Sequence, residues 1–146
     1  MPWRAPPRRA GRQRGRPADG AAPGVGRRAG GAVVLAIIGT GSQAYAQVWA
    51  LAAVRDLREV RVYSRDPGRR KSFAERVTPL VAGACRPATD ARAACEGAQI
   101  VLLAPSSPTP VLDPAWIDPG AYVTTLGPKQ QGRAEFGPDL PEAAPY

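Results

Sequence analysis

The residues with the clearest chemical potential form a short glycine-rich turn. The stretch GTGSQA, residues 39–44, fits the pattern G-x-G-x-x-G/A between an apolar run and a helical pattern. In such a turn the first glycine allows a sharp bend, the second lets a phosphate approach the backbone, and the small sixth residue lets the helix pack on the strand. The N-terminus of the following helix adds free N–H groups and a partial positive charge. The turn therefore predicts a pyrophosphate site formed by Gly39, Thr40, Gly41, Ser42 and Gln43.

The segments on either side of this turn are those that a pyrophosphate site requires. Residues 32–39, AVVLAIIG, are continuously apolar and β-branched, as in a strand buried on both faces of a parallel sheet. A helix is expected over 43–54, with Ser42 as its N-cap. The side chains expected on its buried face, at helical spacing, are Tyr45, Val48, Trp49 and Ala52.

Further strands and helices alternate along the chain. Asp66 and Pro67 are typical of the N-cap and first residue of a helix. Its expected buried residues are Phe73, Ala74 and Val77. Strands are expected at 59–64, 82–86, 99–104 and 121–127, and short helices at 90–96 and 113–117. This alternation predicts βαβ units with right-handed crossovers, and therefore an α/β, Rossmann-like, doubly wound parallel sheet, here incomplete.

The first 31 residues differ in composition from the rest. Residues 1–30 contain eight arginines and one aspartate, and so carry +7 of the net charge of +8. With almost no large apolar side chain, they cannot bury enough surface to offset the entropy of ordering them. We expect a disordered basic tail at 1–31, an NAD(P)-binding Rossmann domain at 32–140 and an irregular end at 141–146. The tail could contact nucleic acid or an anionic membrane, or be a leader without a role; the lack of aromatic residues among its arginines argues against nucleic acid.

Residues 1–46 could alternatively be an export signal. Residues 32–38 would be its apolar core, and Ala-Tyr-Ala at 44–46 its cleavage site. The core is short, and the helical pattern continues through the cleavage site, so the nucleotide interpretation is favoured and a cytoplasmic location is expected. The Arg27-Arg28 pair leaves a twin-arginine signal as a minor alternative.

The end of the second strand indicates which dinucleotide is bound. Domains that bind NAD usually place an Asp or Glu there, which accepts from the ribose 2′-OH. Here Ser64 and Arg65 stand at that point and favour the 2′-phosphate of NADP(H), with Arg69 and Arg70 able to assist. NADP(H) is therefore expected over NAD(H). The alternative is an NAD site with Asp66 as the acid and the arginines on a solvated helix face.

Other common catalytic groups are missing from the sequence. It contains no histidine, and its two cysteines, Cys85 and Cys95, form no C-x-x-C pair. The sequence therefore argues against a metal site and removes Ser-His and Cys-His nucleophiles. The longest apolar run, 32–38, is too short to span a bilayer.

Four stretches together resemble the ornithine cyclodeaminase/mu-crystallin family. They are GTGSQAYAQVWAL from residue 39, VRVYSRDP from 60, CEGAQIVLLAPSSPTPVL from 95 and PGAYVTTLGPKQQGRAEF from 119. Gln43, and the GPK loop at 127–129 followed by Glu135, distinguish the set from a generic Rossmann domain. The similarity covers about residues 33–140.

The resemblance implies a nicotinamide cofactor and chemistry at an amine or imine carbon. Family members transfer hydride between NAD(P)(H) and that carbon, as deaminating cyclases, imine or ketimine reductases and some alanine dehydrogenases. They are usually homodimers joined through a separate substrate domain. By position, Ser64 and Arg65 would meet the adenosine ribose. The other residues that would line the cofactor are Ala104, Pro105, Ser106 and Gly127, the last of them near the nicotinamide.

The sequence departs from the family in ways that bear on activity. The arginine-rich tail replaces sequence that carries substrate-binding residues in the family, and Gln99 stands where an Asp is common. The catalytic aspartate of the cyclodeaminases lies beyond the last matching stretch. We therefore expect a cofactor-binding part that is nearly inactive alone, with an amino-acid or cyclic imine substrate only if a substrate domain is supplied. A homodimer or a partner chain is possible, and an uncovered apolar face would promote association. The alternatives are a non-catalytic NADP(H)-binding module or a fragment.

Overall fold

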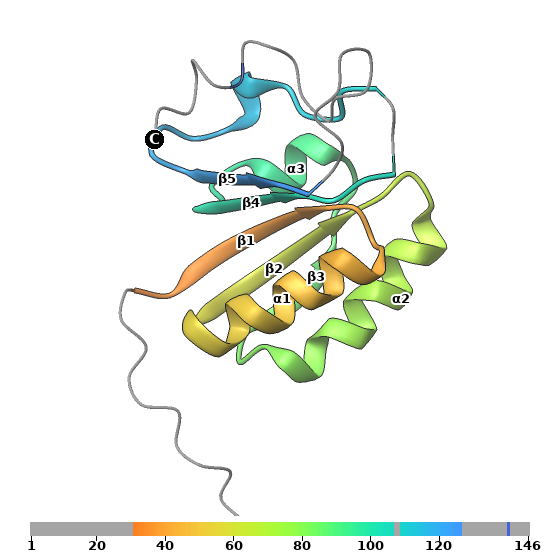
Figure 1. Ribbon diagram of the computed structural model, residues 1–146, viewed down its shortest axis with the longest axis vertical. Helices are drawn as coiled ribbons and strands as arrows, with labels where there is room; N and C mark the ends of the chain where they lie inside the picture. Colours follow the sequence, from red (N-terminus) through yellow and green to blue (C-terminus); the bar gives the residue numbers. More distant parts are fainter. Residues whose placement is uncertain (1–30, 107–108, 127–139, 141–146) are drawn as a thin grey trace, which may run out of the picture.

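The computed structural model describes residues 31–106, 109–126 and 140. Within this part of the chain, strands and helices alternate as the sequence predicts (Figure 1). The strands are β1 (Val33–Ile38), β2 (Leu57–Tyr63), β3 (Ala84–Pro87), β4 (Ile100–Leu103) and β5 (Tyr122–Thr125). The helices are α1 (Ser42–Val54), α2 (Pro67–Val77) and α3 (Ala91–Cys95), and the 3₁₀ turns are η1 (Thr78–Leu80) and η2 (Pro114–Trp116).

The strands form one parallel sheet in the order β3-β2-β1-β4-β5. This arrangement confirms the predicted α/β Rossmann-like class. β1 is central, since Ile38 pairs with Tyr63 of β2 on one side and with Leu103 of β4 on the other. The strand order therefore reverses at the carboxyl ends of β1 and β4, which is where open α/β sheets bind ligands.

Helices cover both faces of the sheet (Figure 1). α1 and α2 pack on one face with Leu35 and Ile37 of β1, while α3 packs on the opposite face with Val34, Ala36 and Ile38. Alternate residues of β1 thus enter two different cores, and all five are at most 2 % exposed. Burial on both faces explains why this strand is apolar without alternation.

Local sequence signals determine where α2 and α3 begin. The Asp66 carboxylate accepts hydrogen bonds from the backbone N–H groups of Gly68 (2.8 Å) and Arg69 (3.1 Å), and Pro67 is the first helical residue, as predicted. Asp90 caps α3 through its carboxylate in the same way. The buried residues of α2 are the predicted ones, Phe73, Ala74 and Val77.

Helix α1 differs from the prediction in its cap and in its buried face. Its N-cap is Gly41, and Ser42 is the first helical residue. The Trp49 side chain, predicted to be buried, is 63 % exposed, and Tyr45 is half-buried. The residues that are buried are Ala44, Val48 and Ala52. Small alanines on this stripe let α1 lie close to the sheet, so a bulky side chain one residue further round the helix points away from it.

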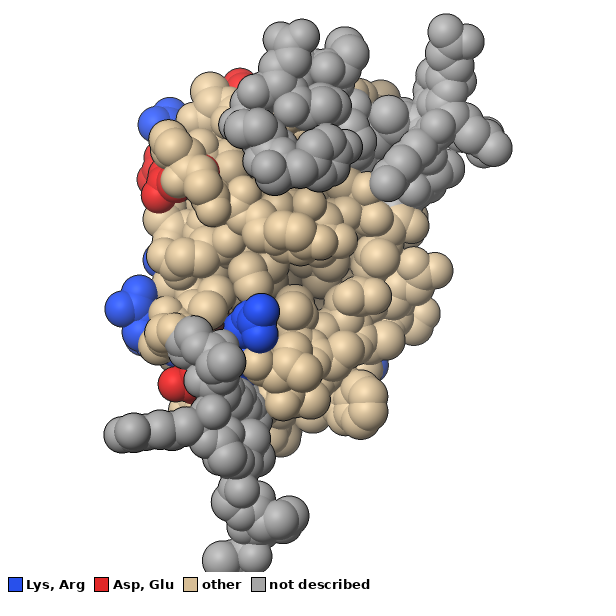
Figure 2. All heavy atoms as spheres, turned by 60° about the vertical axis from the view of Figure 1, so that its left-hand side comes forward, with Lys and Arg blue, Asp and Glu red and all other residues tan. Residues whose placement is uncertain are grey.

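An apolar surface remains on the α1 side of the sheet. Besides Trp49, Val54 is 54 % and Tyr122 is 66 % exposed. Tyr122 pairs with Ile100, which packs with the core beneath α1, so both side chains lie on that face. No residue of α1 is charged. Figure 2 shows a broad uncharged area, with the charged side chains of the described residues lying mostly toward the left of the view.

The described residues provide neither a membrane span nor a metal cluster. No described helix is long and apolar enough to cross a membrane. No group of three or more His, Cys, Asp or Glu side chains in this part of the chain could hold a metal ion. Cys85 and Cys95 are free thiols, and burial raises the pKa of each to about 11. Reactive cysteines have lowered pKa values, so these two are structural.

Candidate functional site

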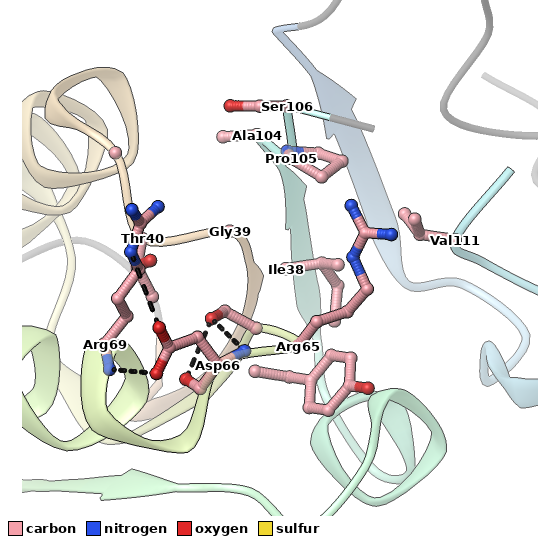
Figure 3. A pocket seen from close by; sticks show the side chains of 13 residues that line it. Ile38, Gly39, Thr40, Arg65, Asp66, Arg69, Ala104, Pro105, Ser106 and Val111 are labelled. Carbon is pink, nitrogen blue, oxygen red and sulfur yellow. Dashed lines mark hydrogen bonds and ion pairs between the residues drawn. The ribbon is translucent and has the colours of Figure 1, made fainter. Parts of the chain in front are cut away.

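A cavity of about 320 Å³ opens at the carboxyl edge of the sheet, where the strand order reverses (Figure 3). Three segments form its wall: residues 38–41 after β1, residues 63–66 with Arg69 after β2, and residues 104–106 with Val111 after β4. Their meeting follows from the parallel sheet, because the carboxyl ends of parallel strands lie along one edge.

Gly39 is required by the packing of the turn. Its φ of +121° is one that L side chains rarely adopt. A Cβ at this position would lie 2.2 Å from the carbonyl oxygen of Ala104. The Gly39 N–H donates to the carbonyl of Tyr63 at 2.8 Å. Gly39 therefore brings the loops after β1, β2 and β4 together.

Packing does not require a glycine at position 41. Its φ of −81° and ψ of 179° suit any residue, and a Cβ there would meet no atom within 4 Å. It is also the N-cap of α1, and no side chain caps this helix, whereas aspartates cap α2 and α3. The open space and the uncapped N–H groups together form a place where an anion can approach the backbone.

Polar side chains gather where β2 ends. The Ser64 hydroxyl bonds to the backbone of Asp66, accepting from its N–H at 3.3 Å and donating to its carbonyl at 3.2 Å. The Asp66 carboxylate caps α2 and lies 3.7 Å from Nε of Arg69. Arg65 is exposed and extends across the cavity toward Val111, away from Asp66 (Figure 3). Asp66 therefore partly neutralises Arg69, while Arg65 has no carboxylate partner among the described residues.

The opposite wall follows β4. Ala104, Pro105 and Ser106 lie across the cavity from Asp66 and Arg69 (Figure 3). The Ala104 N–H donates to the carbonyl of Ile38 at 2.8 Å, which extends the β1–β4 pairing into the loop. The cavity is thus open between two walls that the backbone holds in place.

The structure brings together most of the residues predicted to bind the cofactor. Those that line the cavity are Gly39, Thr40, Gly41, Ser64, Arg65, Ala104, Pro105 and Ser106. Ser42 and Gln43 are exposed in the first turn of α1 but are not in the wall, and Gly127 lies outside the described residues. Arg70, expected to assist Arg65, is not in the wall either, because it bonds to backbone carbonyls behind it.

Sequence reasoning missed three residues of the wall: Ile38, Tyr63 and Val111. Ile38 and Tyr63 are the last residues of β1 and β2. Their position at the ligand-binding edge of a parallel sheet could have identified them. Val111 carries no such signal, because its approach to the cavity depends on the path of the loop after β4.

Comparison with known proteins agrees with this picture. A sequence model of the ornithine cyclodeaminase/mu-crystallin family matches residues 18–146. A presumed dehydrogenase of Rhizobium meliloti is 37 % identical over 113 residues, which are 77 % of this chain and 34 % of that protein. The ketimine reductase mu-crystallin of Mus musculus is 27 % identical over 110 residues, which are 75 % of this chain and 34 % of that protein.

A solved structure shares the fold. Thermococcus litoralis Δ1-pyrroline-2-carboxylate reductase, in complex with NADH and L-proline, superposes with a TM-score of 0.69 at 28 % identity, over 75 % of this chain and 34 % of that one. The chain thus spans about a third of the length of each of these proteins.

Proposed function

The chain belongs to the ornithine cyclodeaminase/mu-crystallin family, and we propose that its cavity binds the pyrophosphate and adenosine of a nicotinamide dinucleotide. One observation carries this proposal. The cavity lies at the reversal of the strand order, and its wall includes the glycine turn that opens the uncapped helix α1. A helix N-terminus with free N–H groups attracts phosphate through hydrogen bonds and its dipole.

The residues of the turn fit a pyrophosphate. Gly41 leaves the start of α1 open, so phosphate oxygens can reach the N–H groups of its first turn. Thr40 lines the same wall and offers a hydroxyl donor. When bound, the cofactor supplies the group that accepts or donates a hydride. The contribution of the described residues is to hold and orient it.

We propose that the adenosine end favours NADP(H) over NAD(H). Arg65 and Ser64 line the cavity where the ribose would lie, and a guanidinium binds a phosphate with charge-assisted hydrogen bonds. Asp66, the residue that would instead suit an NAD ribose, already accepts through Oδ1 from two backbone N–H groups of α2, and its Oδ2 lies 3.7 Å from Nε of Arg69. This engagement supports the phosphate interpretation.

The proposed reaction is hydride transfer at an amine or imine carbon of an amino acid or cyclic imine. In keeping with this, one related protein is a ketimine reductase and a structural neighbour is a complex with L-proline. The chain spans about a third of these proteins. The carboxylate and phenol of the cavity wall, Asp66 and Tyr63, both lie at the end of β2, where the adenosine and not the reacting carbon would be bound. We therefore propose that the chain binds cofactor with little turnover of its own, in the cytoplasm, and that it associates as a homodimer or with a partner chain. Turnover would require a partner that carries a substrate domain.

The test is a titration of the full chain with NADPH and, separately, with NADH, followed by nicotinamide fluorescence. We expect saturable binding that is tighter for NADPH, and Arg65→Ala to remove most of the difference. A folded chain that binds neither cofactor would refute the proposal. Equal affinity for the two would refute the NADP(H) preference alone. Measurable ornithine deamination or imine reduction would contradict the expected inactivity.

A further inference from the structure

Arg70 joins three segments beside the cavity without lining it. It lies on α2, and its guanidinium carbon is 5.1 Å from the centre of the Tyr63 ring. Its Nη1 donates hydrogen bonds to the backbone carbonyls of Ala88 (2.5 Å) and Thr89 (2.8 Å), just after β3. The guanidinium therefore connects α2 and the end of β3 to the face of one aromatic ring.

Tyr63 is the member of this cluster that reaches the cavity. It is the last residue of β2, it lines the cavity, and it packs against the core on the α3 side of the sheet. The residues that follow it on the same wall are Ser64 and Arg65, proposed above to meet the adenosine ribose. The Tyr63 ring thus borders the adenosine end, and nucleic bases stack readily on aromatic side chains.

Arg70 restricts how the Tyr63 ring can lie. Attraction between a cation and the face of an aromatic ring favours one orientation of the pair. The guanidinium is itself held in place, because its Nη1 donates to two backbone carbonyls that directly follow β3. Its Nε is buried and donates to no described atom, so this part of the half-buried side chain is shielded from water, and partial desolvation strengthens the attraction to the ring.

We infer that Arg70 is a positioning residue of the cofactor site. It fixes the Tyr63 ring as the surface against which the adenosine of the cofactor packs. The inference rests on the proposed function, since it names a further residue of that same site. Arg70 does not touch the cofactor in this arrangement and acts through Tyr63.

The chain contains a matched control for this contact. Arg76, also on α2, lies 4.9 Å from the centre of the Tyr45 ring. Neither Arg76 nor Tyr45 lines the cavity. Replacing Arg76 therefore removes the same kind of interaction from the same helix, away from the site.

The experiment compares Arg70→Ala, Arg70→Lys and Arg76→Ala in the full chain, with urea unfolding to show that each is folded. Two probes displace NADPH: adenosine 2′,5′-bisphosphate for the adenosine end, and inorganic pyrophosphate for the glycine turn. Displacement of NADPH reports only probe that binds in the cofactor site, so probe molecules held by arginines elsewhere do not contribute to the signal. We expect Arg70→Ala to weaken the adenosine probe about three- to tenfold and the pyrophosphate by less than about twofold, with Arg76→Ala changing neither.

Arg70→Lys keeps the charge, and an ammonium can still donate to both carbonyls, but it lacks the planar guanidinium that stacks on an aromatic face. We therefore expect a loss of the same kind, and this variant serves if the alanine variant does not fold. In a Tyr63→Ala background, Arg70→Ala should cause no further loss. Four outcomes would overturn the inference and leave the proposed function standing. The first two are equal losses for both probes and equal effects of the Arg70 and Arg76 variants. The others are wild-type affinity in a folded Arg70→Lys chain and additive effects of the Arg70 and Tyr63 variants. A folded wild-type chain that binds no NADPH would overturn both.

Discussion

At the scale of single residues, two glycines of one turn differ in their surroundings, and we propose that they serve different purposes. Gly39 has a left-handed φ, and its Cα faces the backbone of Ala104. Gly41 has an ordinary backbone conformation and open space around it. The motif G-x-G predicts both glycines equally, and only the three-dimensional neighbours separate a packing requirement from a binding one.

Alanine at the two positions should therefore have different effects. We expect Gly39→Ala to lower the free energy of unfolding by about 2 kcal/mol or more, because alanine rarely adopts this φ and its Cβ would displace the backbone of Ala104. Gly41→Ala should cost at most about 1 kcal/mol through the weaker N-cap, yet weaken NADPH binding about tenfold or more, since a methyl group would occupy the path of the phosphate. Urea unfolding and NADPH titration measure the two effects. Unchanged NADPH affinity in Gly41→Ala would contradict the proposed position of the pyrophosphate.

The two free thiols, Cys95 buried and Cys85 half-buried, predict a loss of stability in alkali. Burial raises the pKa of Cys85 and Cys95 from the ordinary value of 9.0 to about 11. Between these values the unfolded chain has released the thiol protons and the folded chain retains them, so the free energy of unfolding should fall as the pH rises from about 9 to about 11. Urea unfolding across this range measures the fall. Cys85→Ala should show a smaller fall than the wild type, and an identical one would contradict the role of that thiol.

At the scale of elements, the N-terminus of α1 differs from those of α2 and α3 in having no side-chain cap. α2 and α3 begin at aspartates whose carboxylates satisfy their first N–H groups, while α1 begins at a glycine with no side-chain cap. Stability alone favours a cap, so the open end of α1 is the one that a ligand can complete. Asp66 has two roles, because it caps α2 and also lines the cavity.

Substitution of Asp66 separates its two roles. Asp66→Ala should lower the free energy of unfolding by about 1 kcal/mol, whereas Asp66→Asn should be nearly neutral because asparagine is an equally good N-cap. If the site takes a 2′-phosphate, Asp66→Asn should strengthen NADPH binding relative to NADH, since a nearby negative charge is removed. Fluorescence titration of both cofactors provides the readout. A selective loss of NADH binding in Asp66→Asn would instead support the NAD site with Asp66 as the ribose acceptor.

At the scale of the whole molecule, the net charge and the exposed apolar side chains belong to different parts of the sequence. Residues 1–30 carry most of the net positive charge, whereas α1 is uncharged and exposes Trp49 and Val54. Tyr122 adds to the exposed apolar surface on the same face of the sheet. Such surfaces promote association between proteins in solution.

Removal of the exposed indole should therefore reduce self-association without harming the fold. We expect Trp49→Gln to change the free energy of unfolding by less than about 0.5 kcal/mol, as for other exposed sites, and to lower the apparent mass in concentration-dependent sedimentation. Val48→Gln, one position earlier and fully buried, should instead destabilise the chain by about 2 kcal/mol or more. Similar destabilisation by the two substitutions would show that the indole is covered in solution.

The alternation of strands and helices, the glycine turn, the Asp66 cap and most residues of the cavity wall could be predicted from the sequence. These features depend on local signals: β-branched apolar runs, helix caps and glycine conformations are set by neighbours in the chain. Three outcomes could be seen only in the tertiary structure: Trp49 is exposed, Val111 reaches the cavity, and Arg70 binds behind the wall instead of in it. Those outcomes depend on how closely α1 lies on the sheet and on which strands become neighbours. Contacts between residues far apart in the sequence decide both, and no local pattern encodes them.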